Sequence, residues 1–250
     1  MAAIPCAVLA GEKKRADGTS VPSRSMELLA DRPMVAWTLD ALASASLVSD
    51  IYVVGLSADA LDRADIHFVE SGDTFIDNLQ RGLNACPGDR VLVATADIPF
   101  LTPASVDDFI QRAQTSGKEF CYSVVPVRLT TAKYPDMKRT AVALHEDVVT
   151  GGNIVVISKA MVDRNAAVIS RIFDQRKSPV GLARVFGLGF LLRLLIASRT
   201  ISLAALERKA ESIMDGTVAA IVSDYPEIAT DVDKDEDLTI ARRVFANDQR

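Results

Sequence analysis

The sequence predicts an α/β fold in which a parallel or mostly parallel sheet is covered by helices on both faces. Two observations support this prediction. Short apolar runs alternate with helix-like segments, and most of these runs are followed by turn residues or by a helix cap. Such alternation is typical of strands joined by crossover helices. With 250 residues, of which 49% are hydrophobic, the chain is long enough to bury one large core.

The first half of the chain contains four predicted strands and three predicted helices. The strands are apolar and partly β-branched, at Ile4–Leu9, Ile51–Gly55, Ile66–Val69 and Val91–Thr95. The helices have apolar residues at helical spacing or begin with capping residues: Pro33–Ala45, a helix capped by Asp73 or Thr74, and one capped by Thr102 with Pro103 at its first position. The loops after the first and the last of these strands, Gly11–Gly18 and Ala96–Leu101, should lie at the carboxyl edge of the sheet, where α/β proteins bind ligands.

The second half is less regular. Its predicted strands are Phe120–Val127, Thr140–Leu144, Ile154–Ile157 and Val218–Val222, and the sequence Gly151-Gly152-Asn153 predicts a turn before the third. Its predicted helices include two that separate near Gly187 and Gly189, one capped by Ser202, and a last one at Leu238–Phe245.

Charge and composition exclude several classes of function. The net charge is −5 and no run of Lys and Arg resembles a nucleic-acid footprint, so a nucleic-acid partner is not expected. Three scattered cysteines do not form a disulfide framework and fit a reducing compartment. Two histidines are too few for a usual zinc site, so any metal should be Mg²⁺ or Mn²⁺ held by carboxylates. The N-terminus has no basic segment typical of a signal peptide, which predicts a cytoplasmic protein.

The most apolar stretch of the chain is Val180–Ile201. Arg184, Arg193 and Arg199 interrupt it, so it is not expected to cross a membrane. We interpret it as core helices or the interface of a homodimer; the alternative is a surface that receives an isoprenoid or lipid-linked acceptor.

Three polar segments are candidates for chemistry. The loop Leu9–Gly18 carries Lys13, Lys14 and Arg15, which suit a polyphosphate, although a solvated surface loop has the same composition. Asp97 directly follows a hydrophobic strand and is a candidate ligand for a divalent ion; the alternative is a turn aspartate. The cluster Asp231–Asp237 suits a helix N-terminus, and Asp231 or Asp233 is a candidate second metal ligand.

These segments resemble the MobA-like NTP transferases. The resemblance rests on AVLAG near the start, on the segment Arg24–Leu42, on VLVATADIPFLTP around Asp97, on GGNI, and on DVDKDEDLTIARR. It implies a three-layer α/β/α sandwich with a mixed, mostly parallel central sheet, Rossmann-like and of the nucleotide-diphospho-sugar transferase type. It also implies a single NTP transferase domain over residues 1–250, with a nucleotide-binding half of about 1–115 and an acceptor-binding half of about 116–250.

The resemblance also implies roles for individual residues. Catalysis would depend on Asp97, Arg15 and Arg24, and the metal would be held by Asp97 with Asp231 or Asp233. The nucleotide would be bound by Leu9, Ala10, Gly11, Lys13, Asn78 and Ala96, and the acceptor by Gly151, Gly152 and Asn153. Two departures from the family pattern concern the phosphate groups: the first loop is one residue shorter and has Glu12 where glycine is common, and Arg24 replaces a lysine.

The implied function is transfer of an NMP from an NTP to a phosphate or hydroxyl of a small acceptor, with Mg²⁺ and with release of pyrophosphate. Two alternatives stay open. One is a glycosyltransferase of the same fold, which would usually have D-x-D where this chain has Thr95-Ala96-Asp97. The other is a non-catalytic nucleotide-binding protein, which the shortened loop suggests.

Overall fold

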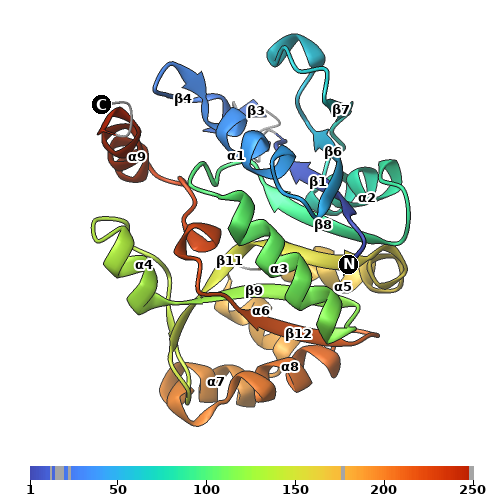
Figure 1. The fold of residues 1–250 in the computed structure, drawn as a ribbon. Helices are drawn as coiled ribbons and strands as arrows, with labels where there is room; N and C mark the ends of the chain where they lie inside the picture. Colours follow the sequence, from blue (N-terminus) through green and yellow to red (C-terminus); the bar gives the residue numbers. More distant parts are fainter. Residues whose placement is uncertain (12, 15–19, 22–23, 176–177, 248–250) are drawn as a thin grey trace.

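An eight-stranded sheet runs through the middle of the molecule and has helices on both faces (Figure 1). The structure is a computed structural model and describes residues 1–11, 13–14, 20–21, 24–175 and 178–247. The strands of the sheet are β1 (Ile4–Leu9), β6 (Val48–Val54), β7 (Ile66–Val69), β8 (Arg90–Thr95), β9 (Phe120–Pro126), β10 (Val142–Ala143), β11 (Val148–Ser158) and β12 (Val218–Val222).

The sheet is mixed and mostly parallel. Its order is β12-β9-β11-β8-β1-β6-β7, with β10 paired beside β11. Strand β11 is antiparallel to β8, β9 and β10, whereas the other neighbours are parallel. Two small hairpins lie outside this sheet, β2 (Lys13–Lys14) with β3 (Ser20–Val21) and β4 (Leu28–Leu29) with β5 (Arg32–Pro33).

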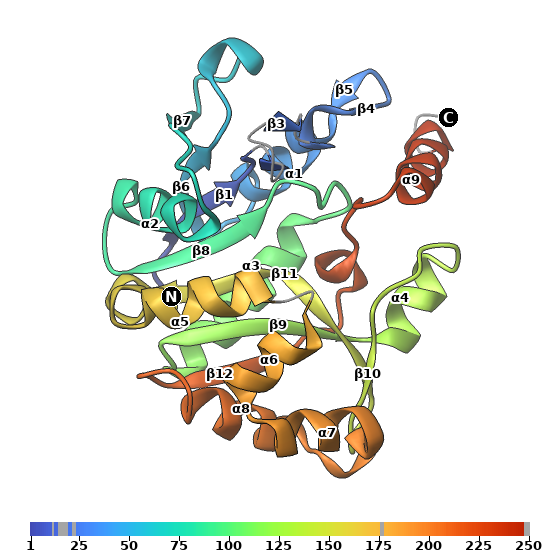
Figure 2. The same ribbon diagram turned by 180° about the vertical axis from the view of Figure 1, so that it is seen from behind.

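Two pairs of helices complete the three predicted layers. Helices α1 (Met34–Ala43) and α3 (Pro103–Ser116) pack on one face, where Leu39 and Phe109 are fully buried in the main core. Helices α2 (Phe75–Ala85) and α5 (Lys159–Gln175) pack on the other face, around Leu83 and Val162 (Figure 2). The remaining helices are α4 (Val127–Lys133), α6 (Pro179–Phe186), α7 (Leu188–Ile196), α8 (Leu203–Glu211) and α9 (Asp235–Asn247), with short 3₁₀ turns η1 (Arg24–Met26), η2 (Ala58–Ala60), η3 (Ser198–Thr200) and η4 (Pro226–Ala229). The three-layer α/β/α prediction is confirmed.

Helices α2 and α3 begin at predicted capping residues, whose side chains accept hydrogen bonds from free backbone N–H groups. Thr74 and Asp77 form a reciprocal capping box at α2, and Thr102 and Ser105 form one at α3. Pro103 occupies the first turn of α3, where it displaces no helical hydrogen bond. The caps Thr74 and Thr102 therefore also fix where the loops after β7 and β8 end.

The predicted turn at Gly151-Gly152-Asn153 is wrong, because these residues lie inside the long strand β11. The pairing of β11 with β9 shifts register between Gly151 and Val155. A side chain at Gly151 would overlap the hydroxyl of Tyr122, and one at Gly152 would overlap Ser123 Oγ. The glycines therefore allow β9 side chains to cross over β11, and no chain reversal is needed.

The apolar stretch after residue 180 forms two helices that separate at Gly187, as predicted, but its interpretation as core is wrong for α7. Helix α7 contains no buried residue, and Leu195 and Ile196 are 70% and 82% exposed. In the described part of the chain, no helix has the length and hydropathy needed to cross a membrane.

Candidate active site

The carboxyl ends of three parallel strands bring predicted nucleotide-binding residues to one edge of the sheet. Leu9 at the end of β1 is in register with Val54 of β6 and Thr95 of β8. The chain stays paired just beyond the strands, since Ala96 N–H donates to the Leu9 carbonyl at 3.3 Å and Ala10 N–H donates to the Val54 carbonyl at 2.9 Å. Leu9, Ala10 and Ala96 therefore lie together, as the sequence predicted.

Glycines allow two loops to approach each other closely at this edge. Gly55 has a φ of +94°, and a Cβ there would overlap Gly11 Cα, so the two loops touch backbone to backbone. A Cβ on Gly11 would be 3.2 Å from Asn78 Nδ2, which places Asn78 of α2 beside the first loop. Asn78 is held there because its Oδ1 accepts the Gly72 N–H at 2.6 Å.

A cavity of about 430 Å³ opens beside these glycines. It is lined by residues 55–57 and 68–71, which are the ends of β6 and β7 and the loops that follow them. Its lining combines apolar residues, among them Phe68, with polar ones, among them Glu70. Such a mixed lining suits a group that is apolar and also carries hydrogen-bonding atoms.

Asp97 lies just past β8 with an unsatisfied carboxylate. Its Oδ1 is buried and has no hydrogen-bond partner among the described residues. Burial raises the pKa of the Asp97 carboxyl; the Thr95 hydroxyl lowers it in part, and the charges of Asp231 and Asp233 raise it further. Buried polar atoms are normally paired, so this oxygen is suited to a cation or a donor from a ligand.

The acidic segment before α9 is attached to Asp97 through the backbone. Val232 N–H donates to the Asp97 carbonyl at 2.8 Å, and Val232 itself is fully buried. The neighbours Asp231 and Asp233 are thereby held near Asp97, close enough for their charges to act on its pKa. The structure therefore places the three predicted metal ligands on two adjoining segments.

Arg139 holds one of these carboxylates. Its Nη1 donates to Asp231 Oδ1 and its Nη2 donates to the Asp231 carbonyl, both at 2.6 Å. The side chain of Arg139 is only 8% exposed, so its end of the ion pair is largely shielded from solvent. It lies in an irregular loop, where no sequence pattern indicated a role.

The donor set fits a divalent cation at Asp97 only in part. Among the described residues, no three His, Cys, Asp or Glu side chains are grouped as a ready metal cage. Mg²⁺ nevertheless is usually held by one or two carboxylates together with water and substrate phosphates, so a complete cage is not required. Asp97 supplies a buried, unpaired oxygen, while Asp231 already pairs with Arg139.

The predicted phosphate-binding cations are only partly placed. Arg24 lies in η1, and its Nη2 is 2.8 Å from Oδ1 of Asp235, the first residue of α9. This contact brings Arg24 to the acidic segment that is attached to Asp97. Arg15 lies outside the described residues, and for Lys13 the structure describes the backbone, in β2.

The predicted acceptor-binding residues of β11 contact η4, which leads into the acidic segment. Asn153 Nδ2 donates to the carbonyl of Ile228 at 3.2 Å, and Gly152 approaches the side chain of Ile228. Ile228 precedes Asp231 by three residues, so β11 and the acidic segment are neighbours.

A buried carboxylate that the sequence did not indicate fixes the same segment. Glu227 of η4 is 3% exposed; its Oε1 accepts from the Thr102 hydroxyl and its Oε2 from Lys133 Nζ, both at 3.0 Å. Thr102 caps α3 directly after the Asp97 loop. Glu227 therefore connects that loop to α4 and to the acidic segment.

Comparison with known proteins agrees with this arrangement. Residues 6–195 match the MobA-like NTP transferase domain. A structure described as a hypothetical transferase from Thermus thermophilus is 34% identical, with 94% of this chain and 99% of that chain covered and a TM-score of 0.82. No curated protein matches the chain significantly.

More distant structures share the fold. A CMP:2-keto-3-deoxy-manno-octonic acid synthetase complexed with CTP is 10% identical, covers 99% of this chain and 100% of its own, and has a TM-score of 0.63. Molybdopterin-guanine dinucleotide biosynthesis protein A from Archaeoglobus fulgidus is 14% identical, with 98% and 100% covered and a TM-score of 0.54. The sheet, the loop that carries Asp97 and the matched domain lead to one conclusion: the chain belongs to the MobA-like NTP transferases, a family of nucleotidyltransferases.

Proposed function

We propose that this protein transfers an NMP from an NTP to a phosphate or hydroxyl of a small acceptor, with Mg²⁺ and with release of pyrophosphate. The observation that carries the proposal is the unpaired, buried Oδ1 of Asp97 at the carboxyl end of β8, beside Asp231. Leaving a buried acceptor unsatisfied costs about 1–3 kcal/mol, so such an atom is retained where a ligand completes it.

The nucleoside is placed at the edge formed by the first loop and β6. Gly55 packs against Gly11 of the first loop, and the adjoining cavity of about 430 Å³, which Gly55 and Phe68 line, accommodates the base. Asn78 offers its amide to the base or ribose beside Gly11. Which base is used follows from the polar groups at the rim of this cavity, among them Glu70.

The triphosphate lies between the first loop and the acidic segment. Arg24 approaches from η1, and we expect Lys13 and Arg15 of the first loop to contribute further positive charge. The Arg24–Asp235 pair is a weak constraint, because the Asp235 side chain is 91% exposed and surface pairs contribute little. Arg24 therefore exchanges Asp235 for a phosphate at small cost, and stabilises negative charge on the leaving pyrophosphate.

In the reaction, an acceptor oxygen attacks the α-phosphorus and forms a new P–O bond while the bond to the β-phosphate oxygen breaks. A phosphate acceptor needs no general base, which agrees with a site built of carboxylates and arginines; a hydroxyl acceptor loses its proton to solvent water or to the released pyrophosphate. Asp97, together with the carboxylate oxygen of Asp231 that Arg139 does not bind, would hold Mg²⁺. The ion would supply charge neutralisation at the α-phosphate. The protein's own contribution is the positioning of the two reactants.

The acceptor binds on the β11 side of Asp97. Gly151 is exposed there, Gly152 is buried against Ser123 and Ile228, and the Asn153 amide is anchored to the Ile228 carbonyl at 3.2 Å. That anchor holds the acceptor surface against the segment carrying Asp231.

The test is pyrophosphate release with each NTP, Mg²⁺ and a panel of phosphate and hydroxyl acceptors. Asp97→Asn should lower kcat by a hundredfold or more, roughly the scale of losing a main electrostatic group, whereas the matched exposed change Asp62→Asn should not. Full turnover in Asp97→Asn would overturn the metal assignment. Preferential use of a UDP-sugar would instead indicate a glycosyltransferase, and NTP binding without turnover for any acceptor would indicate a non-catalytic nucleotide-binding protein.

A further inference from the structure

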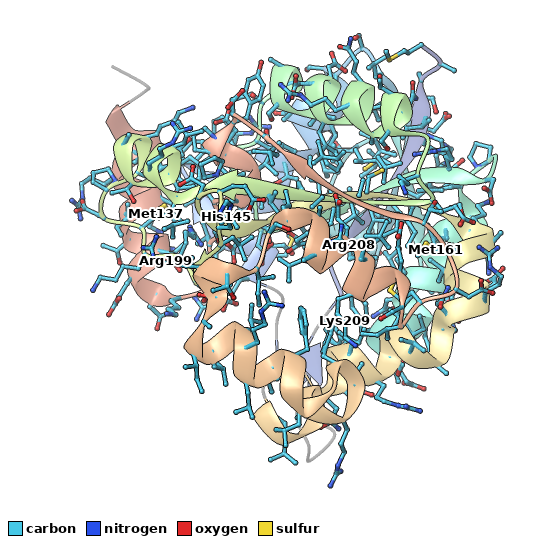
Figure 3. All side chains as sticks on the ribbon, turned by 90° about the horizontal axis from the view of Figure 1, so that it is seen from below. Met137, His145, Met161, Arg199, Arg208 and Lys209 are labelled. Atoms are coloured by element: carbon cyan, nitrogen blue, oxygen red, sulfur yellow. The ribbon has the colours of Figure 1, made fainter. Side chains whose placement is uncertain are left out.

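An apolar cavity of about 330 Å³ lies on the acceptor-binding half, between the sheet and α8. The proposed transfer step assigns it no role. Its walls come from β9, β11, β12, α8 and the region around β10; they include Phe120, Tyr122 and Val124 on β9, and Leu203, Leu206 and Ala210 on α8. Figure 3 views the molecule from the side on which α6, α7 and α8 lie.

The cavity arises from the alternation of side chains along β9. Cys121, Ser123 and Val125 are fully buried on the face that meets the main core. The intervening residues point to the opposite face, where Tyr122 remains 36% exposed under α8. The sheet face at this position is therefore only partly covered by its own chain.

The cavity reaches the predicted acceptor-binding strand. Gly151 is one of its lining residues, and the Tyr122 hydroxyl occupies the space that a side chain at Gly151 would take. Burial raises the pKa of the Tyr122 phenol, and the negative charge of Asp231 raises it further. Tyr122 in the wall of the cavity is thus within electrostatic range of Asp231.

The lining selects an uncharged apolar group. Of the described lining residues, none is a Lys, Arg or His, and one, Glu207, is acidic. Glu207 is itself engaged, since its Oε1 accepts the Ala220 N–H at 2.8 Å. An anion inside the cavity would meet a carboxylate without a compensating cation, whereas an alkyl or prenyl group would meet aliphatic and aromatic carbon. The volume is at the lower end of the range for small-molecule sites.

Helix α7 lies beside α8, and none of its described residues lines the cavity. Lys209 of α8 points toward α7 (Figure 3), and its Nζ lies 5.7 Å from the centre of the Phe190 ring. The exposed Leu195 of α7 therefore provides an apolar position outside the cavity for comparison.

We propose that this cavity binds the uncharged alkyl or prenyl-like part of an amphipathic acceptor, whose polar end reaches Gly151 and the carboxylates beyond it. The identification of the ligand as an acceptor rests on the proposed function, but binding of its apolar part does not require turnover.

Binding is measured with the neutral probe N-phenyl-1-naphthylamine, whose fluorescence rises in apolar sites. We expect 1-decanol to displace it and glycerol not to displace it. Ala210→Phe, which fills the cavity from α8, should weaken probe binding by at least about tenfold, the scale for altering a hydrophobic pocket. Leu195→Ser should leave the affinity unchanged.

Circular dichroism and thermal unfolding check that the variants are folded, and Ala210→Val, a smaller change, should give an intermediate affinity if Ala210→Phe does not fold. Unchanged probe affinity in Ala210→Phe, or loss in Leu195→Ser alone, would overturn the proposal because the probe would then bind elsewhere.

Turnover separates this inference from the proposed function. With an NTP and Mg²⁺, decyl phosphate should have a lower KM than glycerol 3-phosphate, and Ala210→Phe should remove that difference. An equal KM for both acceptors overturns the acceptor role of the cavity. Absence of pyrophosphate release with every acceptor, while Ala210→Phe still abolishes probe binding, rejects the proposed function but supports the apolar site.

Discussion

Val232 donates its backbone N–H to the carbonyl oxygen of Asp97 at 2.8 Å. This bond joins the loop that carries Asp97 to the acidic segment before α9, which is far away in the sequence. It brings Asp231 and Asp233 to the end of β8, where their charges act on the Asp97 carboxylate. Like charges held close together store unfavourable energy in the absence of a cation.

Asp97→Asn should stabilise the ligand-free protein at neutral pH. The pKa of Asp97 is raised above 3.8 in the folded state, so the folded protein binds this proton more tightly than the unfolded chain, and stability falls as the pH rises through that window. The amide removes this cost, and each ~1 kcal/mol gained should raise Tm by about 2–4 °C. Thermal unfolding from pH 4 to 8 should show the gain shrinking toward acid.

Two observations provide the control for this experiment. Mg²⁺ with an NTP should raise the Tm of the wild type and of the exposed change Asp62→Asn, but not that of Asp97→Asn. A lower Tm of Asp97→Asn at pH 7 would show that the carboxylate is a structural hydrogen-bond acceptor.

Arg139→Met should destabilise the protein, because it leaves the Asp231 carboxylate and carbonyl without the two donors at 2.6 Å. Breaking a buried pair costs about 3–5 kcal/mol, and the lower end applies since Asp231 is 28% exposed. Arg139→Lys should recover only part of this, because one ammonium group does not reproduce a two-pronged contact. Urea unfolding measures both variants.

The double variant Arg139→Met with Asp231→Asn separates the charge pair from packing. It should be less destabilised than the sum of the single changes. Additive losses would contradict a direct coupling between these residues.

Gly55→Ala should weaken NTP binding and stability together. Its Cβ would overlap Gly11 Cα, and its φ of +94° is unfavourable for alanine. Gly88→Ala is the matched control, because Gly88 has a φ of +72° with no atom within 4 Å of the added Cβ. Gly88→Ala should therefore show only the backbone strain of about 1–2 kcal/mol and unchanged NTP affinity, both measurable by calorimetry.

Thr102→Ala should cost more than Thr74→Ala. Both changes remove a capping box, worth about 1 kcal/mol. Thr102 additionally donates to the buried Glu227, so its loss leaves that carboxylate with fewer donors and loosens the loop beyond Asp97. Equal losses in chemical unfolding would show that Glu227 is satisfied by Lys133 alone.

Local patterns predicted much of the fold. The strands Ile4–Leu9, Ile66–Val69 and Val218–Val222 have the predicted bounds, because short apolar runs ending at turn residues are a local signal. The caps at Thr74 and Thr102 were also predictable, since capping depends on residues three positions apart. Gly151-Gly152-Asn153 was mistaken for a turn because the neighbour that explains these glycines, Tyr122, lies on another strand.

By itself, the sequence determined the alternation of strands and helices and the place of Asp97 at the end of a strand. Tertiary structure alone decided that Val232 bonds to Asp97, that Arg139 holds Asp231, and that α7 lies exposed while α8 covers a cavity. The physical reason is the range of the interactions. Hydrophobic period and capping act over a few residues, whereas a paired carboxylate or a covered sheet face depends on contacts between distant segments, whose closeness no local pattern encodes.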